Sequence, residues 1–428
     1  MTVARPAAPR PAAGPAAPDL RGLPLPELTD LVRGLGAPAY RGRQIARWVY
    51  GRGVEDISEM TDLPITFRER LRGAARIGTL TVRRSTDAAD GSATKLLAAC
   101  EDGQTVECVL MRFDDGRRSA CVSTQAGCAM GCAFCATGLG GFARNLTAGE
   151  IISQGLAIRA RADRRLSNVV FMGMGEPLAN YEATVRAARI LAAPWGLGIG
   201  VRHLTLSTVG LVPQIRRLAG EGLQITLAVS LHAPTDALRR RLVPVTERYP
   251  IADLIAACRD YLAATGRRLT FEYVLIDGVN DGDAEGRALG RLLRGLLCHV
   301  NVIPLNPVPG IALRRPAVSR VRAFARCVRD AGIPVTVRIE RGTEIQAACG
   351  QLRLADGSGR ASRWTPADSP ATMKSKPADR LPADSPAAVK SKPAPLPGGI
   401  PVPAAGGARA GGLAGHHEIK ARRGEGWA

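Results

Sequence analysis

The stretch Cys128-Ala-Met-Gly-Cys132-Ala-Phe-Cys135 places three cysteines on one short segment, and no fourth cysteine follows at ligand spacing. Cys thiolate is the usual protein ligand of iron–sulfur clusters, so three thiolates on one loop suit three irons of a cubane cluster. The absent fourth ligand leaves one iron open to bind a substrate or cofactor. We therefore expect Cys128, Cys132 and Cys135 to bind a [4Fe–4S] cluster.

A structural zinc site is the alternative for these cysteines. Zinc in such sites takes four protein ligands, usually as paired Cys-x2-Cys knuckles or mixtures of Cys and His. Of the five histidines, only His203, His232 and His299 lie in the body of the chain, and none neighbours the cysteine loop. The spacing therefore favours the cluster over zinc.

The composition predicts a globular protein of a reducing compartment. The chain has 428 residues, 46% of them hydrophobic, and no apolar run long enough to span a bilayer. Residues 1–19 are rich in Ala and Pro but have no apolar core region, so they do not form a secretory signal. Ten cysteines without such a signal indicate thiols that bind metals or act in catalysis. We expect a bacterial cytoplasmic protein with no membrane partner.

The charge is strongly basic. The chain has 58 Lys and Arg against 38 Asp and Glu, a net charge of +20. Such an excess attracts polyanions, and a nucleic acid is the leading candidate. The alternative is that a GC-rich genome favours arginine codons and the charge is only solvated surface. Lys95, the only lysine before the C-terminal tail, supports that caution.

Four segments are expected along the chain. Residues 1–21 are of low complexity and predicted to be disordered, and residues 22–78 form a helical accessory module that we expect to bind RNA. Residues 79–355 form the core, which ends in a loop that contains Cys349. Residues 356–428 form a basic Pro/Ala-rich tail in which residues 366–377 recur almost unchanged as residues 382–393.

The accessory module combines helical periodicity with arginines and aromatics. Four apolar residues recur at helical spacing: Leu25, Leu28, Val32 and Leu35. Gly36 is placed to end that helix. Residues 40–50 interleave Arg41, Arg43 and Arg47 with Trp48 and Tyr50, a combination that suits RNA. Trp48 and Ile45 fit the inside of the module equally well. We favour the core for the aromatic residues and the surface for the arginines.

The core alternates strands and helices, which predicts an α/β fold. Strand-like runs cover residues 120–123, 168–172, 203–207, 226–230, 270–276, 300–304 and 334–339, after two earlier ones at 92–99 and 105–109. Helical stretches at 148–159, 181–193, 251–264 and 320–331 separate many of them. This alternation predicts βα units and a parallel sheet curled into a partial, open β/α barrel.

Polar residues follow several of these strands, where the active-site groups of parallel barrels lie. Glu176 ends the glycine-rich turn after residues 168–172 and can bind the ammonium of an amino acid. Ser207, Ser230 and Asn306 can hold ribose or carboxylate oxygens. Each of them has an alternative as a turn or capping residue, and His232 as a satisfied core donor. Together they predict one polar pocket.

Two further cysteines complete the candidate site. Cys121 lies on the strand before the cysteine loop, and Cys349 is flanked by small residues that leave its thiol accessible. A thiol that takes a methyl group becomes a thioether, which a second thiol can later displace as a disulfide. The alternative is an ordinary buried cysteine, which we assume for Cys100, Cys258, Cys298 and Cys327.

These residues resemble the bacterial RlmN family of radical S-adenosylmethionine (SAM) methyltransferases over residues 23–352. The matching segments, besides the cysteine loop, are residues 121–128, 171–177, 205–208, 230–234, 301–306 and 347–351. The resemblance implies methylation of adenine C2 in 23S rRNA (adenosine 2503) and tRNA (adenosine 37). It also implies a [4Fe–4S] cluster, two SAM per turnover, an external flavodoxin-like electron donor and a monomer.

The resemblance further implies roles for single residues. One SAM methylates Cys349, and a second, bound at the open iron, yields a deoxyadenosyl radical that activates this methyl group for addition to C2. Glu107 then removes the C2 proton, and Cys121 releases the product by forming a disulfide with Cys349. The family's SAM contacts correspond here to Gly175, Glu176, Ser207, Ser230, Leu231, His232 and Asn306.

Two alternatives to this function stay open. The sister family Cfr methylates adenine C8 with the same apparatus, and Pro177 favours the C2 enzymes only weakly. A non-catalytic RNA-binding protein with a structural metal would contain zinc and would not depend on Cys349. The chain departs from the family at Glu344 and Gln346, where aspartate is common, and Cys108 has no interpretation.

Overall fold

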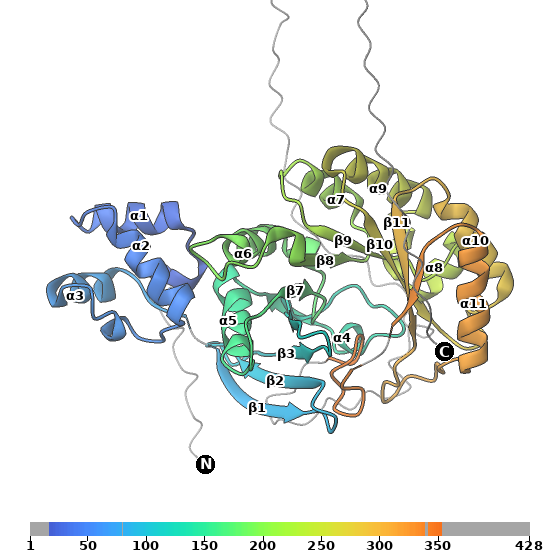
Figure 1. Ribbon diagram of the computed structural model, residues 1–428, viewed down its shortest axis with the longest axis horizontal. Helices are drawn as coiled ribbons and strands as arrows, with labels where there is room; N and C mark the ends of the chain where they lie inside the picture. The colour runs from blue at the N-terminus through green and yellow to red at the C-terminus, as the bar shows by residue number, and fades with distance from the viewer. Residues whose placement is uncertain (1–16, 79, 339–340, 353–428) are drawn as a thin grey trace, which may run out of the picture. The chain divides into compact units, whose positions relative to one another are not determined.

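A single large sheet dominates the computed structural model, which describes residues 17–78, 80–338 and 341–352. Within these residues ten strands form the sheet in the order β1-β2-β3-β4-β7-β8-β9-β10-β11-β12 (Figure 1). Their bounds are β1 (Thr81–Asp87), β2 (Ala93–Ala99), β3 (Thr105–Arg112), β4 (Arg118–Cys121), β7 (Asn168–Phe171), β8 (Leu204–Thr208), β9 (Thr226–Ser230), β10 (Leu269–Leu275), β11 (Cys298–Pro304) and β12 (Val335–Val337).

The sheet has a parallel and an antiparallel part. Strands β4 and β7 to β12 pair in parallel, each with its neighbour in the sheet. Strands β1, β2 and β3 extend this sheet by antiparallel pairing onto β4. Among the described residues β1 and β12 are the two edges and do not pair with each other. The predicted α/β fold with an open barrel is therefore confirmed.

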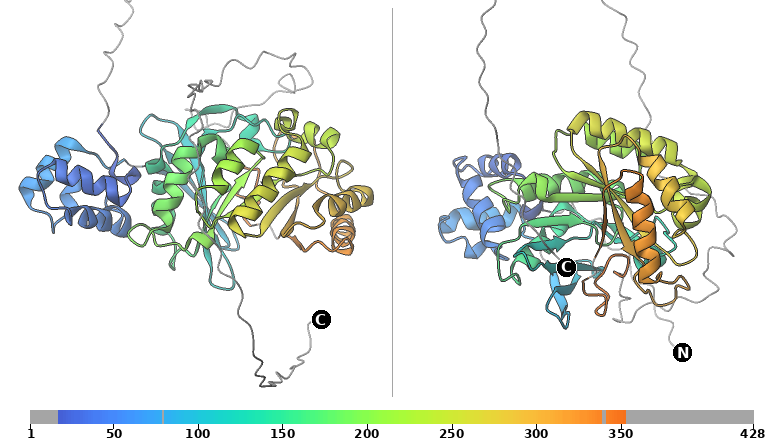
Figure 2. Two further views of the ribbon diagram at one scale, coloured as in Figure 1. Left: turned by 90° about the horizontal axis from the view of Figure 1, so that it is seen from above. Right: turned by 45° about the vertical axis from the view of Figure 1, so that its right-hand side comes forward.

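Helices connect successive parallel strands and lie on the outer side of the curved sheet (Figures 1 and 2). The bounds are α5 (Ala148–Arg159), α6 (Tyr181–Ala192), α7 (Val212–Ala219), α9 (Ile251–Thr265), α10 (Asp283–Leu293) and α11 (Val318–Asp330), with the shorter α8 (Asp236–Leu242) after β9. Several are amphipathic: α9, for example, buries Leu254, Cys258 and Tyr261 on one face. Helix α5, by contrast, buries nine of its twelve residues. The four helices predicted from the sequence all form.

A small helical module precedes the sheet. It contains α1 (Leu25–Gly34), α2 (Arg41–Ala46), a π-helical turn (Arg47–Arg52) and α3 (Ile65–Ala74). Trp48 and Tyr50 are buried, whereas Arg43 and Arg47 are exposed. The Trp48 Nε1 donates to Asp62 Oδ1 at 2.5 Å, and the Tyr50 hydroxyl donates to the Leu23 carbonyl oxygen at 2.5 Å. Our interpretation is confirmed for the aromatics and for Arg43 and Arg47. Arg41 is half-buried and donates to the Asp62 carbonyl oxygen at 3.1 Å.

Residues 17–21 belong to the segment predicted to be disordered, and they are among the described residues. Leu20 and Arg21 are buried, and Asp19 Oδ1 accepts hydrogen bonds from the Arg21 and Gly78 amides at 3.0 and 2.8 Å. Low complexity does not reveal such contacts, because the partners lie far away in the sequence. The predicted tail, residues 356–428, lies outside the described residues. No described helix is both long and apolar enough to cross a membrane.

Candidate active site

The cysteine loop is the connection of a small β-hairpin. Strand β5 (Gln125–Gly127) leads into it, α4 (Ala136–Leu139) follows the last cysteine, and β6 (Phe142–Asn145) returns beside β5. The Cys128 amide donates to the Gly141 carbonyl oxygen at 2.7 Å, which closes the loop at its base. The hairpin thereby directs all three cysteines toward the carboxyl ends of the parallel strands.

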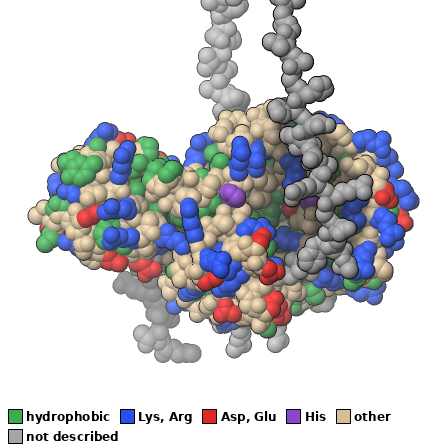
Figure 3. All heavy atoms as spheres, in the orientation of Figure 1, with side chains coloured by type: hydrophobic (Ala, Val, Ile, Leu, Met, Phe, Trp, Pro, Cys, Tyr) green, Lys and Arg blue, Asp and Glu red, His purple; other side chains and the backbone are tan. Residues whose placement is uncertain are grey.

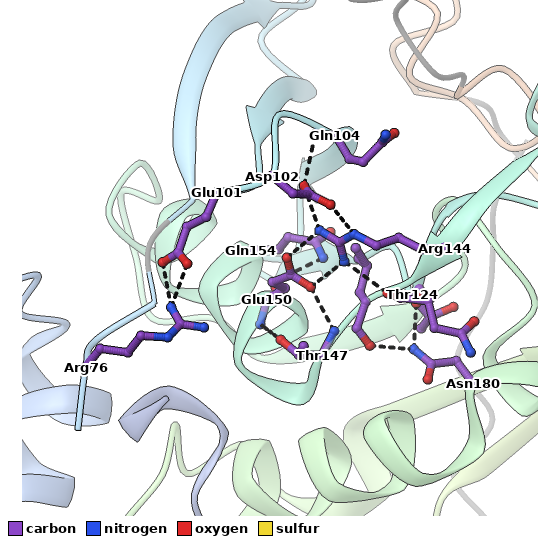
Figure 4. A network of polar contacts seen from close by, with 12 residues as sticks. Arg76, Glu101, Asp102, Gln104, Thr124, Arg144, Thr147, Glu150, Gln154 and Asn180 are labelled. Carbon is purple, nitrogen blue, oxygen red and sulfur yellow. Dashed lines mark hydrogen bonds and ion pairs between the residues drawn. The ribbon is translucent and has the colours of Figure 1, made fainter. Parts of the chain in front are cut away.

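A polar network fixes this hairpin to its surroundings (Figure 4). The Arg144 guanidinium on β6 lies between Asp102 and Glu150, with the Arg144 Nη2 at 2.9 Å from Asp102 Oδ1 and 2.7 Å from Glu150 Oε1. Both carboxylates raise the pKa of Arg144. Thr147 and Glu150 form a capping box that begins α5. The hairpin is therefore attached both to α5 and to the turn between β2 and β3.

Two buried amide side chains secure the segment that enters the hairpin (Figure 4). Gln154 accepts from the Ser123 amide at 2.8 Å and donates to the Ser123 carbonyl oxygen at 2.9 Å. The Asn180 Nδ2 donates to the carbonyl oxygens of Thr124 and Leu146 at 2.8 and 2.7 Å. Because buried backbone groups are costly to leave unpaired, these contacts hold the path of the chain between β4 and the cysteines.

Most of the predicted site residues line one cavity of about 150 Å³, which we call the first cavity. These are Cys128, Cys132, Cys135, Gly175, Glu176, Ser207, Ser230, His232, Asn306 and Cys349. Leu231 is fully buried beside them and does not line the cavity, and neither Glu107 nor Cys121 reaches it. The cavity lies where the parallel strands end, as expected for a barrel of this kind.

Glu176 is buried in the wall of the first cavity. Its Oε1 accepts from the Leu178 amide at 3.0 Å and its Oε2 from the Val209 amide at 2.8 Å. Burial raises the pKa of Glu176 to about 7, although these hydrogen bonds oppose the rise. A carboxylate held in this way can accept the ammonium of an amino acid, and it gains a compensating charge when it does.

Two glycines allow the turn after β7 to lie against the segment that leads into the cysteines. A Cβ at Gly173 would come within 2.6 Å of Ser123 Oγ, and one at Gly175 within 2.5 Å of the Gln125 side chain. Gly175 also has a φ of +100°. Only glycine satisfies this approach and this backbone conformation, so the turn places Glu176 beside the cysteine loop.

His232 and Asn306 complete the polar lining. The His232 Nδ1 accepts from the Val274 amide at 3.0 Å, and burial lowers the pKa of His232 to about 3, so its ring is neutral. Its edge packs on Phe134 of the cysteine loop, with ring centroids 4.7 Å apart. The Asn306 Nδ2 donates to the Cys349 carbonyl oxygen at 3.0 Å, while its buried Oδ1 has no hydrogen-bond partner.

A second cavity of about 520 Å³ adjoins the first, and Cys121 and Cys349 both line it. The two cavities share six lining residues: Met172, Ile303, Asn306, Arg338, Cys349 and Leu352. Burial and, to a smaller extent, the neighbouring Cys349 thiol raise the pKa of Cys121 to about 12. All ten cysteines are free thiols. Cys349 thus connects the cysteine loop on one side with Cys121 on the other.

Glu107 lies behind these cavities in a buried ion pair. The Lys95 Nζ is 3.0 Å from Glu107 Oε1 and 3.3 Å from the carbonyl oxygen of Gln346, three residues before Cys349. The strand register pairs Lys95 with Val109, Leu97 with Glu107 and Val109 with Cys121, so Lys95, Glu107 and Cys121 share one face of the sheet. Sequence reasoning missed Lys95, although a single lysine among many arginines was a signal.

The departures from the family pattern have local explanations. Glu344 Oε1 accepts from the Ala89 amide at 3.3 Å, and Gln346 has a φ of +54° and presents its carbonyl oxygen to Lys95. Cys108 is a fully buried core residue. Cys100, Cys258 and Cys298 are buried as assumed. Cys327 is only half-buried, because it lies on α11 next to the face of that helix that is exposed to solvent.

Sequence analysis also missed two buried charged residues at the site. Glu272 on β10 lines the first cavity and accepts from the Asn301 Nδ2 at 2.8 Å, and burial raises its pKa. Arg239 is fully buried and donates to the carbonyl oxygens of Ser230 and Leu231, both at 3.1 Å. No spacing pattern marks either residue. Only the tertiary structure shows that Glu272 lines the cavity and that Arg239, on α8, binds the backbone beside Ser230.

The residues of the first cavity fit a cluster and SAM in their chemistry. Three thiols supply the soft ligands that iron requires, and the unpartnered Asn306 Oδ1 supplies an acceptor for a ligand's amine or hydroxyl. Among the described residues no three His, Cys, Asp or Glu side chains are grouped closely enough to form a metal site. The residues therefore fit the cluster and SAM in the kind of ligand atoms they offer and in lining one cavity.

Comparison with known proteins finds matches over most of the described chain. Residues 122–288 match the family model of the radical SAM superfamily, and residues 18–77 match that of the ribosomal RNA large subunit methyltransferase N-terminal domain. Two relatives are named probable dual-specificity RNA methyltransferase RlmN. The protein from Moorella thermoacetica is 53% identical, covering 79% of this chain and 97% of the relative. The protein from Chloroflexus aurantiacus is 51% identical, covering 77% of this chain and 90% of the relative.

A solved structure is similar over the same region. A radical SAM methyltransferase from Sphaerobacter thermophilus superposes with a TM-score of 0.76 and 54% identity, covering 78% of this chain and 99% of that structure. The described body of the chain therefore has relatives of more than 50% identity that it covers almost completely.

Proposed function

The chain belongs to the RlmN family of radical SAM RNA methyltransferases, and on this premise we propose that it methylates C2 of adenosine 2503 in 23S rRNA and of adenosine 37 in tRNA. One observation carries the proposal. Cys349 lines both the cavity that contains the three-cysteine loop and the adjoining cavity that contains Cys121. A thiol in this position can receive a methyl group from one side and deliver it on the other.

We assign binding of the cofactors to the first cavity. Cys128, Cys132 and Cys135 are the proposed ligands of a [4Fe–4S] cluster. When bound, the cluster and two SAM per turnover supply the electron, the radical and the methyl group. Glu176 binds the amino group of SAM, and further contacts from the cavity wall are Gly175, Ser207, Ser230, His232 and Asn306. Leu231, the remaining contact that the family resemblance implies, is buried beside them and does not line the cavity.

The second cavity is the proposed place of the adenine. Its C2 is electron-poor and not nucleophilic, so the methyl group is first carried by the Cys349 sulfur rather than transferred directly. Once the methyl carbon is bonded to both C2 and sulfur, Glu107 takes the C2 proton. The Cys121 thiolate then attacks the Cys349 sulfur and a disulfide forms. The electron pair of the broken sulfur–carbon bond goes to the methylene carbon on C2, which takes up a proton and becomes the methyl group. An external flavodoxin-like reductant restores both thiols.

Mass spectrometry of RNA nucleosides tests the proposed reaction. The protein is reconstituted anaerobically and incubated with methyl-labelled SAM, a reductant and a 23S rRNA fragment. Labelled 2-methyladenosine is expected, and none with Cys349→Ala. 8-Methyladenosine would instead place the protein with the sister family, and methylation by Cys349→Ala would refute the two-step mechanism. Purified protein with stoichiometric zinc and no iron would support a structural metal.

Removal of the resolving thiol tests the release step. We expect Cys121→Ala to accumulate a covalent protein–RNA adduct, because the Cys349 sulfur cannot be freed without a second thiol. Denaturing gel electrophoresis with labelled RNA measures the adduct. Cys108→Ala is the control, because this cysteine is also buried yet points away from the second cavity. Normal yields of free methylated RNA from Cys121→Ala would refute the assignment.

A further inference from the structure

The turn between β3 and β4 has a feature that the cysteine chemistry does not use. Residues 113–117 read Phe-Asp-Asp-Gly-Arg, and the Phe113 amide donates to the Arg117 carbonyl oxygen at 3.0 Å. Two guanidiniums contact the Phe113 ring: that of Arg117 at 4.5 Å from its centroid and that of Arg341 at 4.7 Å. Two positive charges are thus held beside one aromatic ring.

The carboxylates that accompany these two arginines are exposed and easily replaced. Arg117 pairs with Asp115 at 2.6 Å, and their side chains are 52% and 53% exposed. Arg341, whose side chain is 20% exposed, lies 4.0 Å from Asp114, whose side chain is fully exposed. Surface pairs of this kind contribute at most about 1 kcal/mol and are screened by salt. A phosphate, which accepts two parallel hydrogen bonds from a guanidinium, can displace them.

Neighbouring Arg118 shows the opposite arrangement. It is buried, and its Nε and Nη2 bind the two oxygens of Asp163 at 2.6 and 2.7 Å. The Arg118 guanidinium is therefore already bound within the protein and is not available to a ligand. Arg117 on this turn and Arg341 from the segment after β12 pair instead with exposed carboxylates, which leaves them available to a ligand.

The two arginines lie on the same cavity as the reactive cysteines. Phe113, Arg117 and Arg341 line the second cavity together with Cys121 and Cys349. The cavity therefore has three arginines, Arg117, Arg338 and Arg341, and an aromatic ring as well as the thiols that the reaction needs. A nucleotide has matching parts, an anionic phosphate and a base, joined by a ribose.

We propose that Arg117 and Arg341 bind the phosphates next to the target adenosine while its base enters the second cavity toward Cys349. The inference rests on the proposed function and adds the residues that hold the RNA. Stacking on Phe113 keeps both guanidiniums in place before RNA arrives, which reduces the entropy lost on binding. The target base must leave its stack to reach Cys349, and contacts to the flanking phosphates hold the strand in that conformation.

The salt dependence of RNA binding tests this assignment. Fluorescence anisotropy measures the Kd of the full chain for a labelled single-stranded fragment containing the target adenosine, over a series of salt concentrations. Each lost phosphate contact on single-stranded RNA reduces the slope of log Kd against log salt by about 0.7. We expect that reduction in Arg117→Ala and in Arg341→Ala. Arg117→Lys keeps the charge and retains the slope.

Arg216 provides a matched control. Its side chain on α7 is 51% exposed and pairs with Asp260 at 2.9 Å, much like Arg117 with Asp115. We expect Arg216→Ala to bind RNA with an unchanged slope. An equal reduction in Arg216→Ala would mean that overall charge alone binds RNA and would overturn the site. Unchanged slopes in both test variants would also overturn it, whereas a wild-type chain that binds no RNA would overturn the proposed function itself.

Discussion

At the scale of single residues, burial sets the protonation states around the two cavities. It raises the pKa of the Cys121 thiol to about 12 and of the Glu176 carboxyl to about 7, and it lowers that of His232 to about 3. Near neutral pH these groups are a thiol, a carboxyl that titrates and a neutral imidazole. Cys121 must therefore lose its proton before it can attack the Cys349 sulfur.

The raised pKa of Glu176 predicts a pH-dependent stability of the cluster-free protein. Glu176 binds its proton more tightly in the folded protein than in the unfolded chain. The free energy of unfolding therefore falls as pH rises from about 4.5 toward about 7, by an amount on the order of 3 kcal/mol. Urea unfolding between pH 5 and 8 measures it. Glu176→Gln should remove this part of the slope, and identical pH profiles of the two proteins would contradict the prediction.

Lys95 is expected to position Glu107 and the Cys349 loop together. In Lys95→Met the Glu107 carboxylate loses a buried partner, and we expect the protein to lose about 3 kcal/mol of stability and methylation to fall at least tenfold. Lys95→Arg should recover part of both. Accumulation of the covalent protein–RNA adduct on denaturing gels distinguishes positioning from simple destabilisation, because the adduct persists when the C2 proton is not removed. A folded Lys95→Met protein that releases methylated RNA at the normal rate would refute the role.

At the scale of elements, turns decide how the site is assembled. The hairpin β5–β6 presents the cysteines, the turn after β7 brings Glu176 beside them, and the loop after β12 places Cys349 between the two cavities. The Ala136 amide donates to the Gly350 carbonyl oxygen at 2.8 Å, so the first and last of these segments are joined directly.

The turn after β7 predicts a local intolerance to side chains. In Gly173→Ala the new Cβ would meet Ser123 Oγ and the Ser123 amide nitrogen at 2.6 and 2.8 Å, so the turn must shift. We expect a loss of about 2 kcal/mol in urea unfolding. Gly34→Ala is the control, because a Cβ there meets nothing within 4 Å and alanine favours the helix. Equal stabilities of the two variants would contradict the packing argument.

At the scale of the whole molecule, a few buried contacts attach the helical module to the barrel, and the surface is strongly basic. The Arg21 Nη1 donates to Ser153 Oγ on α5 at 3.0 Å, and its Nη2 donates to the Val54 carbonyl oxygen at 3.2 Å. Lys and Arg side chains are spread over the described part of the face in Figure 3. This distribution agrees with a polyanionic substrate, since it attracts RNA from a distance.

Arg21 and Glu27 should contribute very differently to this attachment. Arg21 is buried, so Arg21→Ala leaves its partners unpaired and should cost about 3 kcal/mol in urea unfolding. Glu27 pairs with Arg186 at 2.7 Å on the surface, and Glu27→Gln should cost less than about 1 kcal/mol. A small effect of Arg21→Ala would show that the module is held mainly by apolar packing.

The sequence by itself determined the cysteine loop, the strand–helix alternation and the polar residues that follow the strands. Each of these depends on short-range spacing or periodicity, which a linear pattern records directly. The helix at Ala148–Arg159 has its predicted bounds, and the polar residues share a cavity because parallel strands end on one side of a sheet. The assigned chemical roles came from family resemblance and stay predictions.

Only the tertiary structure decided which distant residues meet. Lys95 and Gln346 are 251 positions apart, and Arg21 and Ser153 are 132 apart, yet each pair forms a hydrogen bond. The division into two cavities that Cys349 separates, and the contact of Arg341 with Phe113, likewise depend on the order of strands in the sheet. Such contacts leave no periodic signal, because they depend on the packing of the folded chain and not on local preference.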